Sequence, residues 1–140
     1  MKNLIPTILL VIVEAYISLN AICLPIDHFR IEEASEHYFL YELEERLKRP
    51  FIHGNIVGLG IYLLSRLQNN DSSFITEMMN ESGLVYKPFS MNIKKDDLIN
   101  SLLNLKKFVK SKDKLWYTII DDSEINLEWI KKNISELKFN

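Results

Sequence analysis

The amino-acid sequence predicts a mainly α-helical protein, a compact bundle of five or six helices around one central apolar helix at about residues 55–68. Apolar residues recur at helical spacing in several separate segments of the 140-residue chain. Four glycines and four prolines leave no long flexible linker, and no internal repeat is found. Because 47% of the residues are hydrophobic, the chain can build a core without disulfides. We therefore expect a single helical domain over residues 1–140.

The first apolar segment, residues 4–24, has three interpretations: a buried first helix, a signal peptide or a membrane anchor. Lys2 and the apolar run after it fit a signal peptide, although Glu14 interrupts the segment. A helix that starts near Pro6 and stops before Pro25 has about 18 residues and a length of about 27 Å. That length is marginal for crossing a bilayer.

A polar wedge on this first helix favours burial in a protein core. Four side chains fall within about 60° of one another at 100° per residue. They are Asn3, Thr7, Glu14 and Ser18. A signal peptide has no need of such a face, so we expect a retained core helix and a cytoplasmic protein. Export, or membrane contact through residues 4–24, is the alternative.

Residues 35–49 have the pattern of an amphipathic helix, and Pro50 is expected to end it. Four apolar side chains face inward: Phe39, Leu40, Leu43 and Leu47. Three acid–base pairs at spacing four are expected on the outer face. They are Glu42 with Arg46, Glu44 with Lys48, and Glu45 with Arg49. This helix is therefore predicted to carry a solvated, charged face.

The central helix follows at once and contains a single formal charge, Arg66, between residues 51 and 68. Gly54, Gly58 and Gly60 each lower its helix propensity by roughly 1 kcal/mol relative to alanine. Tertiary packing has to compensate for this loss. Glycines without side chains predict that a neighbouring backbone comes close to this helix.

Shorter elements complete the predicted bundle. Serines after the central helix start a short helix through Met79, and another helix fits residues 96–110, with two aspartates at its N-terminal end. Residues 84–91 contain Pro88 and favour an extended loop or an edge strand, and residues 115–120 favour a strand. If these two segments pair, they form one short β-hairpin. A last helix is predicted from Asp121 through Leu137.

No catalytic residue, metal ligand or cofactor-binding residue is predicted from the sequence. The single cysteine, Cys23, lies in or just after the first apolar segment and is expected to be a buried hydrophobe. His28, His37 and His53 do not have a recognised metal-ligand spacing. Glu33 and His37 lie one helical turn apart, but acidic residues are so frequent nearby that such a pair arises by chance. We therefore expect a protein that is not an enzyme.

Charge is unevenly distributed along the chain, although the net charge is only −2. Residues 27–45 contain seven acidic residues, whereas residues 94–114 contain seven lysines. Cations are expected near a helix C-terminus, and the lysine cluster at residues 106–114 contains no arginine for base readout. We therefore expect no nucleic-acid binding and assign partner binding to the acidic stretch. The predicted binding residues are Asp27, Glu32, Glu33, Glu36, Glu42 and Glu45.

In size, charge and absence of an enzyme motif, the chain resembles the small helical immunity proteins of bacterial contact-dependent inhibition and polymorphic toxin systems. The resemblance implies toxin neutralisation: the protein would bind a cognate toxin domain and cover its active site. Many such toxins are basic nucleases, which an acidic helix would attract by electrostatic steering. The expected partner is therefore a basic toxin domain.

Overall fold

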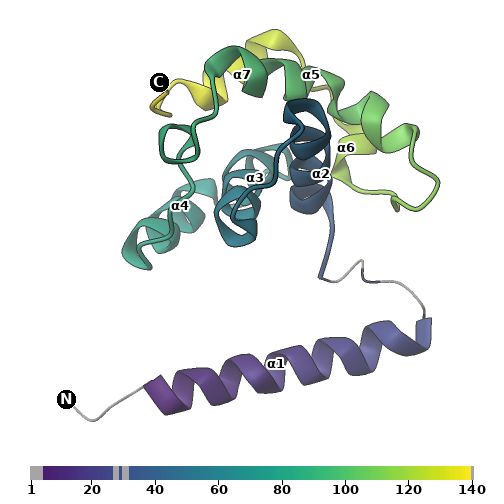
Figure 1. Ribbon diagram of the computed structural model, residues 1–140, viewed down its shortest axis with the longest axis vertical. Helices are drawn as coiled ribbons and strands as arrows, with labels where there is room; N and C mark the ends of the chain where they lie inside the picture. The colour runs from purple at the N-terminus through teal and green to yellow at the C-terminus, as the bar shows by residue number, and fades with distance from the viewer. Residues whose placement is uncertain (1–4, 27–28, 30–31, 140) are drawn as a thin grey trace. The chain divides into compact units, whose positions relative to one another are not determined.

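The computed structural model describes residues 5–26, 29 and 32–139 (Figure 1). Within these residues it contains seven α-helices, one 3-10 helix and no strand. The elements are α1 (Ile5–Ile26), α2 (Ser35–Leu47), α3 (His53–Leu67), α4 (Ser72–Glu81), η1 (Pro88–Met91), α5 (Lys95–Lys110), α6 (Ile119–Asp122) and α7 (Leu127–Ile134). The mainly α-helical prediction is confirmed, with one helix more than the largest number expected.

The chain divides into two compact units, Met1–Ala34 and Ser35–Asn140. In the described part of the first unit, α1 is the one regular element. The second unit contains α2 to α7 and η1. The expectation of one domain over residues 1–140 stays a prediction.

Helix α1 is longer than its prolines indicated. It spans 22 residues, or about 33 Å, because the turn that contains Pro25 continues to Ile26. From Thr7 to Ile26 it is long and apolar enough to cross a membrane, and only 6% of this stretch is buried. The expectation of a retained core helix stays a prediction. Cys23 is buried, as predicted.

Helices α2, α3 and α5 form the centre of the second unit. Helix α2 packs against both α3 and α5, α4 packs on α3, and α7 contacts α3 and α5 (Figure 1). The largest fully buried side chains of this core are mostly aliphatic. They are Phe39, Leu43, Ile56, Leu59, Leu63, Leu64, Ile93, Leu98, Leu102, Leu105, Ile120 and Ile130. The inward positions predicted for α2 are confirmed for Phe39, Leu40 and Leu43, and Leu47 is partly buried.

Helix α2 ends two residues earlier than predicted, because Lys48 adopts a left-handed conformation with φ of 52°. Beyond this turn, Arg49 donates to the carbonyl oxygens of Met91 and Asn92, both at 2.9 Å. The expected Glu45–Arg49 pair is therefore replaced by a link from the end of α2 to η1 and its cap.

The β-hairpin predicted for residues 84–91 and 115–120 is wrong. Residues 84–87 have no regular structure, and Pro88 begins η1, where its fixed φ and missing N–H are tolerated. In the second segment, Thr118 caps α6: its backbone N–H donates to Asp121 at 2.9 Å, and its hydroxyl accepts from Ile120. A Thr-x-x-Asp capping box thus prevailed over the β-propensity of this stretch.

The C-terminal helix begins six residues later than predicted. Asp121 and Asp122 belong to α6, and α7 starts after Asn126, whose side chain accepts from the backbone N–H of Trp129 at 2.9 Å. The helix predicted through Leu137 is therefore divided into two shorter ones. Ile120 of α6 and Ile130 of α7 are both fully buried in the core.

Candidate functional site

The predicted acidic residues do not form one continuous exposed surface among the described residues. Asp27 lies outside the residues that the structure describes. Glu32 and Glu33 are half-buried in the turn that precedes α2. Glu36, Glu42 and Glu45 lie on α2, and each of these three carboxylates contacts a different nitrogen donor.

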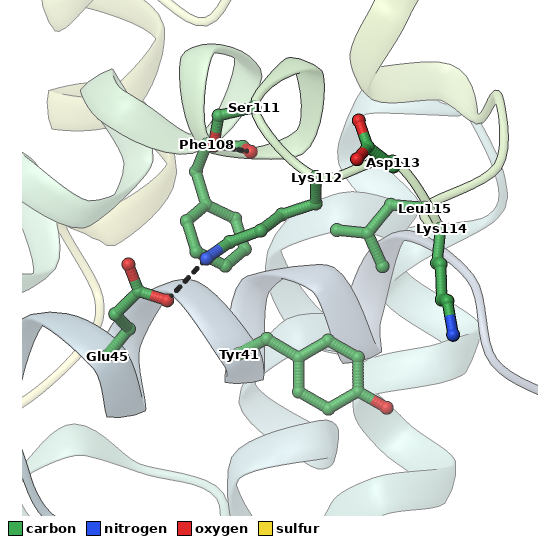
Figure 2. Close-up of a pocket in the computed structure, with 8 residues that line it drawn as sticks. All are labelled: Tyr41, Glu45, Phe108, Ser111, Lys112, Asp113, Lys114 and Leu115. Carbon is green, nitrogen blue, oxygen red and sulfur yellow. Dashed lines mark hydrogen bonds and ion pairs between the residues drawn. The ribbon is translucent and has the colours of Figure 1, made fainter.

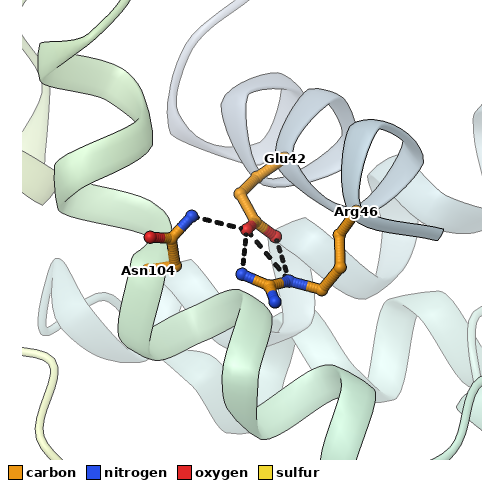
Figure 3. Close-up of polar contacts among 3 residues, drawn as sticks. All are labelled: Glu42, Arg46 and Asn104. Atoms are coloured by element: carbon orange, nitrogen blue, oxygen red, sulfur yellow. Dashed lines mark hydrogen bonds and ion pairs between the residues drawn. The ribbon is translucent and has the colours of Figure 1, made fainter. Parts of the chain in front are cut away.

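Glu42 is turned into the protein, with 2% of its surface exposed. One carboxylate oxygen accepts hydrogen bonds from Arg46 at 2.6 Å and from Asn104 of α5 at 2.9 Å (Figure 3). Arg46 Nε approaches both carboxylate oxygens, at 3.1 and 3.4 Å. The predicted Glu42–Arg46 pair exists within α2, with 29% of the Arg46 side chain exposed, and the hydrogen bond from Asn104 joins its carboxylate to α5. Glu42 is therefore not available as an acidic surface residue.

Glu45 is the most exposed of the three α2 carboxylates, with 53% of its side chain accessible. Its oxygen accepts a hydrogen bond from Lys112 Nζ at 2.7 Å. That hydrogen bond, together with the positive charges of Lys112 and Lys48, lowers the pKa of the Glu45 carboxyl below its usual value. The acidic stretch and the lysine-rich stretch, 67 residues apart in sequence, thus meet in an ion pair.

A cavity of about 540 Å³ opens beside this ion pair, between α2 and the segment that follows α5. Figure 2 shows Tyr41 and Glu45 on α2, with Phe108 and Lys112 opposite them. Its lining consists of Tyr41, Glu45, Phe108, Ser111, Lys112, Asp113, Lys114 and Leu115. We call this cavity the α2–α5 groove. The Lys112 ammonium lies 4.7 Å from the centre of the Phe108 ring, which adds a cation–π contact.

Two aromatic side chains follow the α2–α5 groove directly along the chain. Trp116 and Tyr117 are 51% and 55% exposed. The backbone N–H of Trp116 donates to the Tyr38 hydroxyl at 2.9 Å, which fixes this segment against α2. Aromatic side chains beside a polar rim are typical of protein-binding surfaces. The sequence marked these residues as a strand and so missed their place beside a groove.

The structure also brings two histidines together. His37 of α2 and His53 of α3 have their Nε2 atoms 3.2 Å apart, and their ring centres are separated by 5.1 Å. The other ring nitrogen of His37, Nδ1, lies 2.9 Å from Glu36 Oε1. Residues 16 positions apart on different helices give no sequence signal for this contact. Among the described residues, no group of three or more His, Cys, Asp or Glu side chains has the arrangement of a metal site.

The structure therefore offers two chemically distinct arrangements in the second unit: the α2–α5 groove, with its mixed charge, and the His37–His53 pair. The first is suited to protein contact and the second to proton or cation chemistry. Comparisons with protein-family models, with curated proteins and with solved structures find no match to this chain.

Proposed function

We propose that the protein is a non-catalytic binding protein, an immunity protein that neutralises a bacterial toxin by covering its active site. The observation that carries the proposal is the α2–α5 groove, where an exposed carboxylate, Glu45, stands beside apolar and aromatic lining residues. A basic toxin domain would place a cation against Glu45 and apolar side chains against Tyr41 and Leu115. Trp116 and Tyr117 would enlarge the contact.

Charge and aromatic groups would have separate tasks in such an interface. Surface charges act mainly on the association rate, because they steer diffusing partners at long range. Aromatic anchors act mainly on the dissociation rate, because most of the binding energy comes from a few well-buried side chains. Glu45 is therefore expected to affect the association rate, and Trp116 is expected to affect the dissociation rate.

Reversing the acidic charge should slow association without unfolding the protein. We expect Glu45→Lys with Asp113→Lys, the two acids that line the groove, to lower the association rate at least about tenfold at low salt, and the difference should shrink as salt is added. The partner to be tested is any toxin-like domain that the neighbouring reading frame is found to encode. Rates are measured by stopped-flow or surface plasmon resonance, and folding is checked by circular dichroism melting.

Glu77→Lys with Glu81→Lys is the matched control, since it makes the same charge change on exposed positions of α4. If the partner binds at the α2–α5 groove, this control variant should keep a much larger part of the wild-type association rate. If both double variants slow association equally, the loss of rate comes from the change in net charge alone. An unchanged association rate in Glu45→Lys with Asp113→Lys would mean that the α2–α5 groove is not part of the binding surface.

A second candidate function is that of an exported or membrane-tethered helical protein, and α1 favours it. The stretch from Thr7 to Ile26 is long enough to span the roughly 30 Å hydrocarbon core of a bilayer. Two of its polar side chains are satisfied within the helix: Ser18 donates to the carbonyl of Glu14 at 2.8 Å, and Asn20 donates to that of Tyr16 at 2.9 Å. In an apolar environment such as a bilayer, polar groups have to make their hydrogen bonds within the protein.

Under this second candidate, membrane association should depend on the apolar character of α1. Ile12→Lys places a charge near the helix centre, where insertion costs about 2.5–3.5 kcal/mol, whereas the control Ile12→Leu does not. We expect the intact wild type and Ile12→Leu in the carbonate-resistant membrane fraction and Ile12→Lys in the soluble fraction. A mature N-terminus about 20 residues into the chain would identify a cleaved signal peptide instead. Intact wild-type protein in the soluble fraction would contradict both forms of this candidate.

A further inference from the structure

We infer that His37 and His53 form a two-histidine site for a divalent transition-metal ion of the zinc class, with Glu36 as the carboxylate that orients His37. This inference is independent of the proposed binding function. It concerns residues of α2 and the start of α3, all within the second unit.

The separation of the two Nε2 atoms is that of two ligands on one metal ion. Zinc–imidazole bonds are about 2.0–2.1 Å long, so two nitrogens on a tetrahedral zinc ion lie about 3.3 Å apart. The observed distance between His37 Nε2 and His53 Nε2 is 3.2 Å. Both histidines thus place the same ring nitrogen at the separation that one shared ion requires.

The position of Glu36 selects the form of His37 that binds a metal. A carboxylate accepts the proton of Nδ1–H, and Glu36 Oε1 lies 2.9 Å from Nδ1 of His37. The neutral ring then carries its lone pair on Nε2, the atom that faces His53. Metal-binding histidines commonly donate their second nitrogen to a carboxylate in this way, which fixes the tautomer and raises the basicity of the ligand.

The two histidines differ in burial in a manner that suits a metal site. His37 is buried on α2, whereas His53 is exposed in the first turn of α3. Helices α2 and α3 pack tightly, with Glu36 against Gly60 of α3. The helix packing therefore supports the ring of His37, and the exposed ring of His53 gives an ion access from solvent. The remaining coordination positions are left to water or to a ligand from a bound partner.

An N–H···N hydrogen bond, in which one Nε2 donates to the other, is the competing explanation of the same distance. It needs no metal, and replacing one histidine would then have no effect on metal binding. The two explanations are separated by measuring metal affinity in the full-length chain, kept in a non-ionic detergent and freed of metal with a chelator.

The wild type is titrated with Zn²⁺ by calorimetry and with Co²⁺ by visible absorption at neutral pH. We expect one equivalent of each ion to bind, and the visible absorption of Co²⁺ should change on binding. Glu36→Gln should weaken the affinity by about 10–100-fold, the effect typical of losing an orienting carboxylate. His53→Ala should abolish the one-equivalent binding, and because His53 is exposed this variant should remain folded.

Glu77→Gln is the matched control for the loss of one carboxylate and should keep the wild-type affinity. Saturating Zn²⁺ should also raise the melting temperature of the wild type but not that of His53→Ala. Identical Zn²⁺ and Co²⁺ titrations for the wild type and His53→Ala would overturn the inference and leave a hydrogen-bonded pair. Absence of Zn²⁺ binding by the folded wild type would do the same.

Discussion

Gly60→Ala is expected to lower the free energy of unfolding by about 2–3 kcal/mol, the upper part of the range for overpacking a tight contact. A Cβ atom at residue 60 would lie 2.8 Å from the carbonyl oxygen of Glu36 and 2.9 Å from its Cα. These atoms belong to the backbone of α2, so they cannot rotate aside as a side chain can. The helices α2 and α3 would have to separate, and the core between them would open.

The other two glycines of α3 provide a graded comparison. A Cβ at Gly58 would meet mainly the Leu84 side chain, at 2.8 Å, whereas nothing lies within 4 Å of a Cβ at Gly54. Gly58→Leu should therefore lower the free energy of unfolding by more than about 1 kcal/mol through overpacking. Gly54→Ala should leave the free energy of unfolding unchanged or raise it by up to about 1 kcal/mol. Urea unfolding followed by circular dichroism measures all three. Equal stability of Gly60→Ala and Gly54→Ala would contradict the close approach of α2 and α3.

Arg46→Met is expected to be the other strongly destabilising change, by roughly 3 kcal/mol, because it leaves a buried carboxylate without its cation. Glu42 is almost fully buried, and without Arg46 it would retain the single neutral donor of Asn104. Burying an uncompensated charge costs more than the methionine side chain recovers by packing. The loss should appear as a lower urea midpoint with an unchanged slope.

The double variant Glu42→Met with Arg46→Met distinguishes charge from packing. It removes both partners and replaces them with apolar groups of similar length, which is often nearly neutral for a buried ion pair. We therefore expect the double variant to be more stable than Arg46→Met alone. A double variant less stable than the single one would mean that the aliphatic part of Glu42 and the Asn104 hydrogen bond matter more than the charge.

Local patterns in the sequence were sufficient for most helices but not for their ends. The apolar spacing in residues 55–68 and 96–110 predicted α3 and α5 to within two residues at each end. Helix periodicity is a property of neighbouring residues, so it needs no knowledge of the rest of the chain. The hairpin was wrong because β-propensity depends on cross-strand neighbours, while the caps at Pro88 and Thr118 act within three residues.

The candidate site was less predictable, because its contacts join distant parts of the chain. The sequence identified Glu45 and the lysine-rich stretch, but not their meeting across the α2–α5 groove. It identified His37 and His53, but not the 3.2 Å between their Nε2 atoms. Side chains that face each other across two helices depend on how those helices cross, and one-dimensional spacing does not encode that angle.

The sequence by itself determined the α-helical class, the apolar N-terminal helix and the inward faces of α2, α3 and α5. The N-terminal helix follows from a continuous apolar run, and the inward faces follow from apolar residues that recur at helical spacing over a few turns. The tertiary structure alone decided the environment of the charges. Glu42 and Glu45 are three residues apart on one helix, yet Glu42 is buried against Asn104 and Glu45 is exposed beside Lys112. The physical reason is that a charge turns inward only where another element supplies its hydrogen-bond partners, and α5 supplies them at one of these positions.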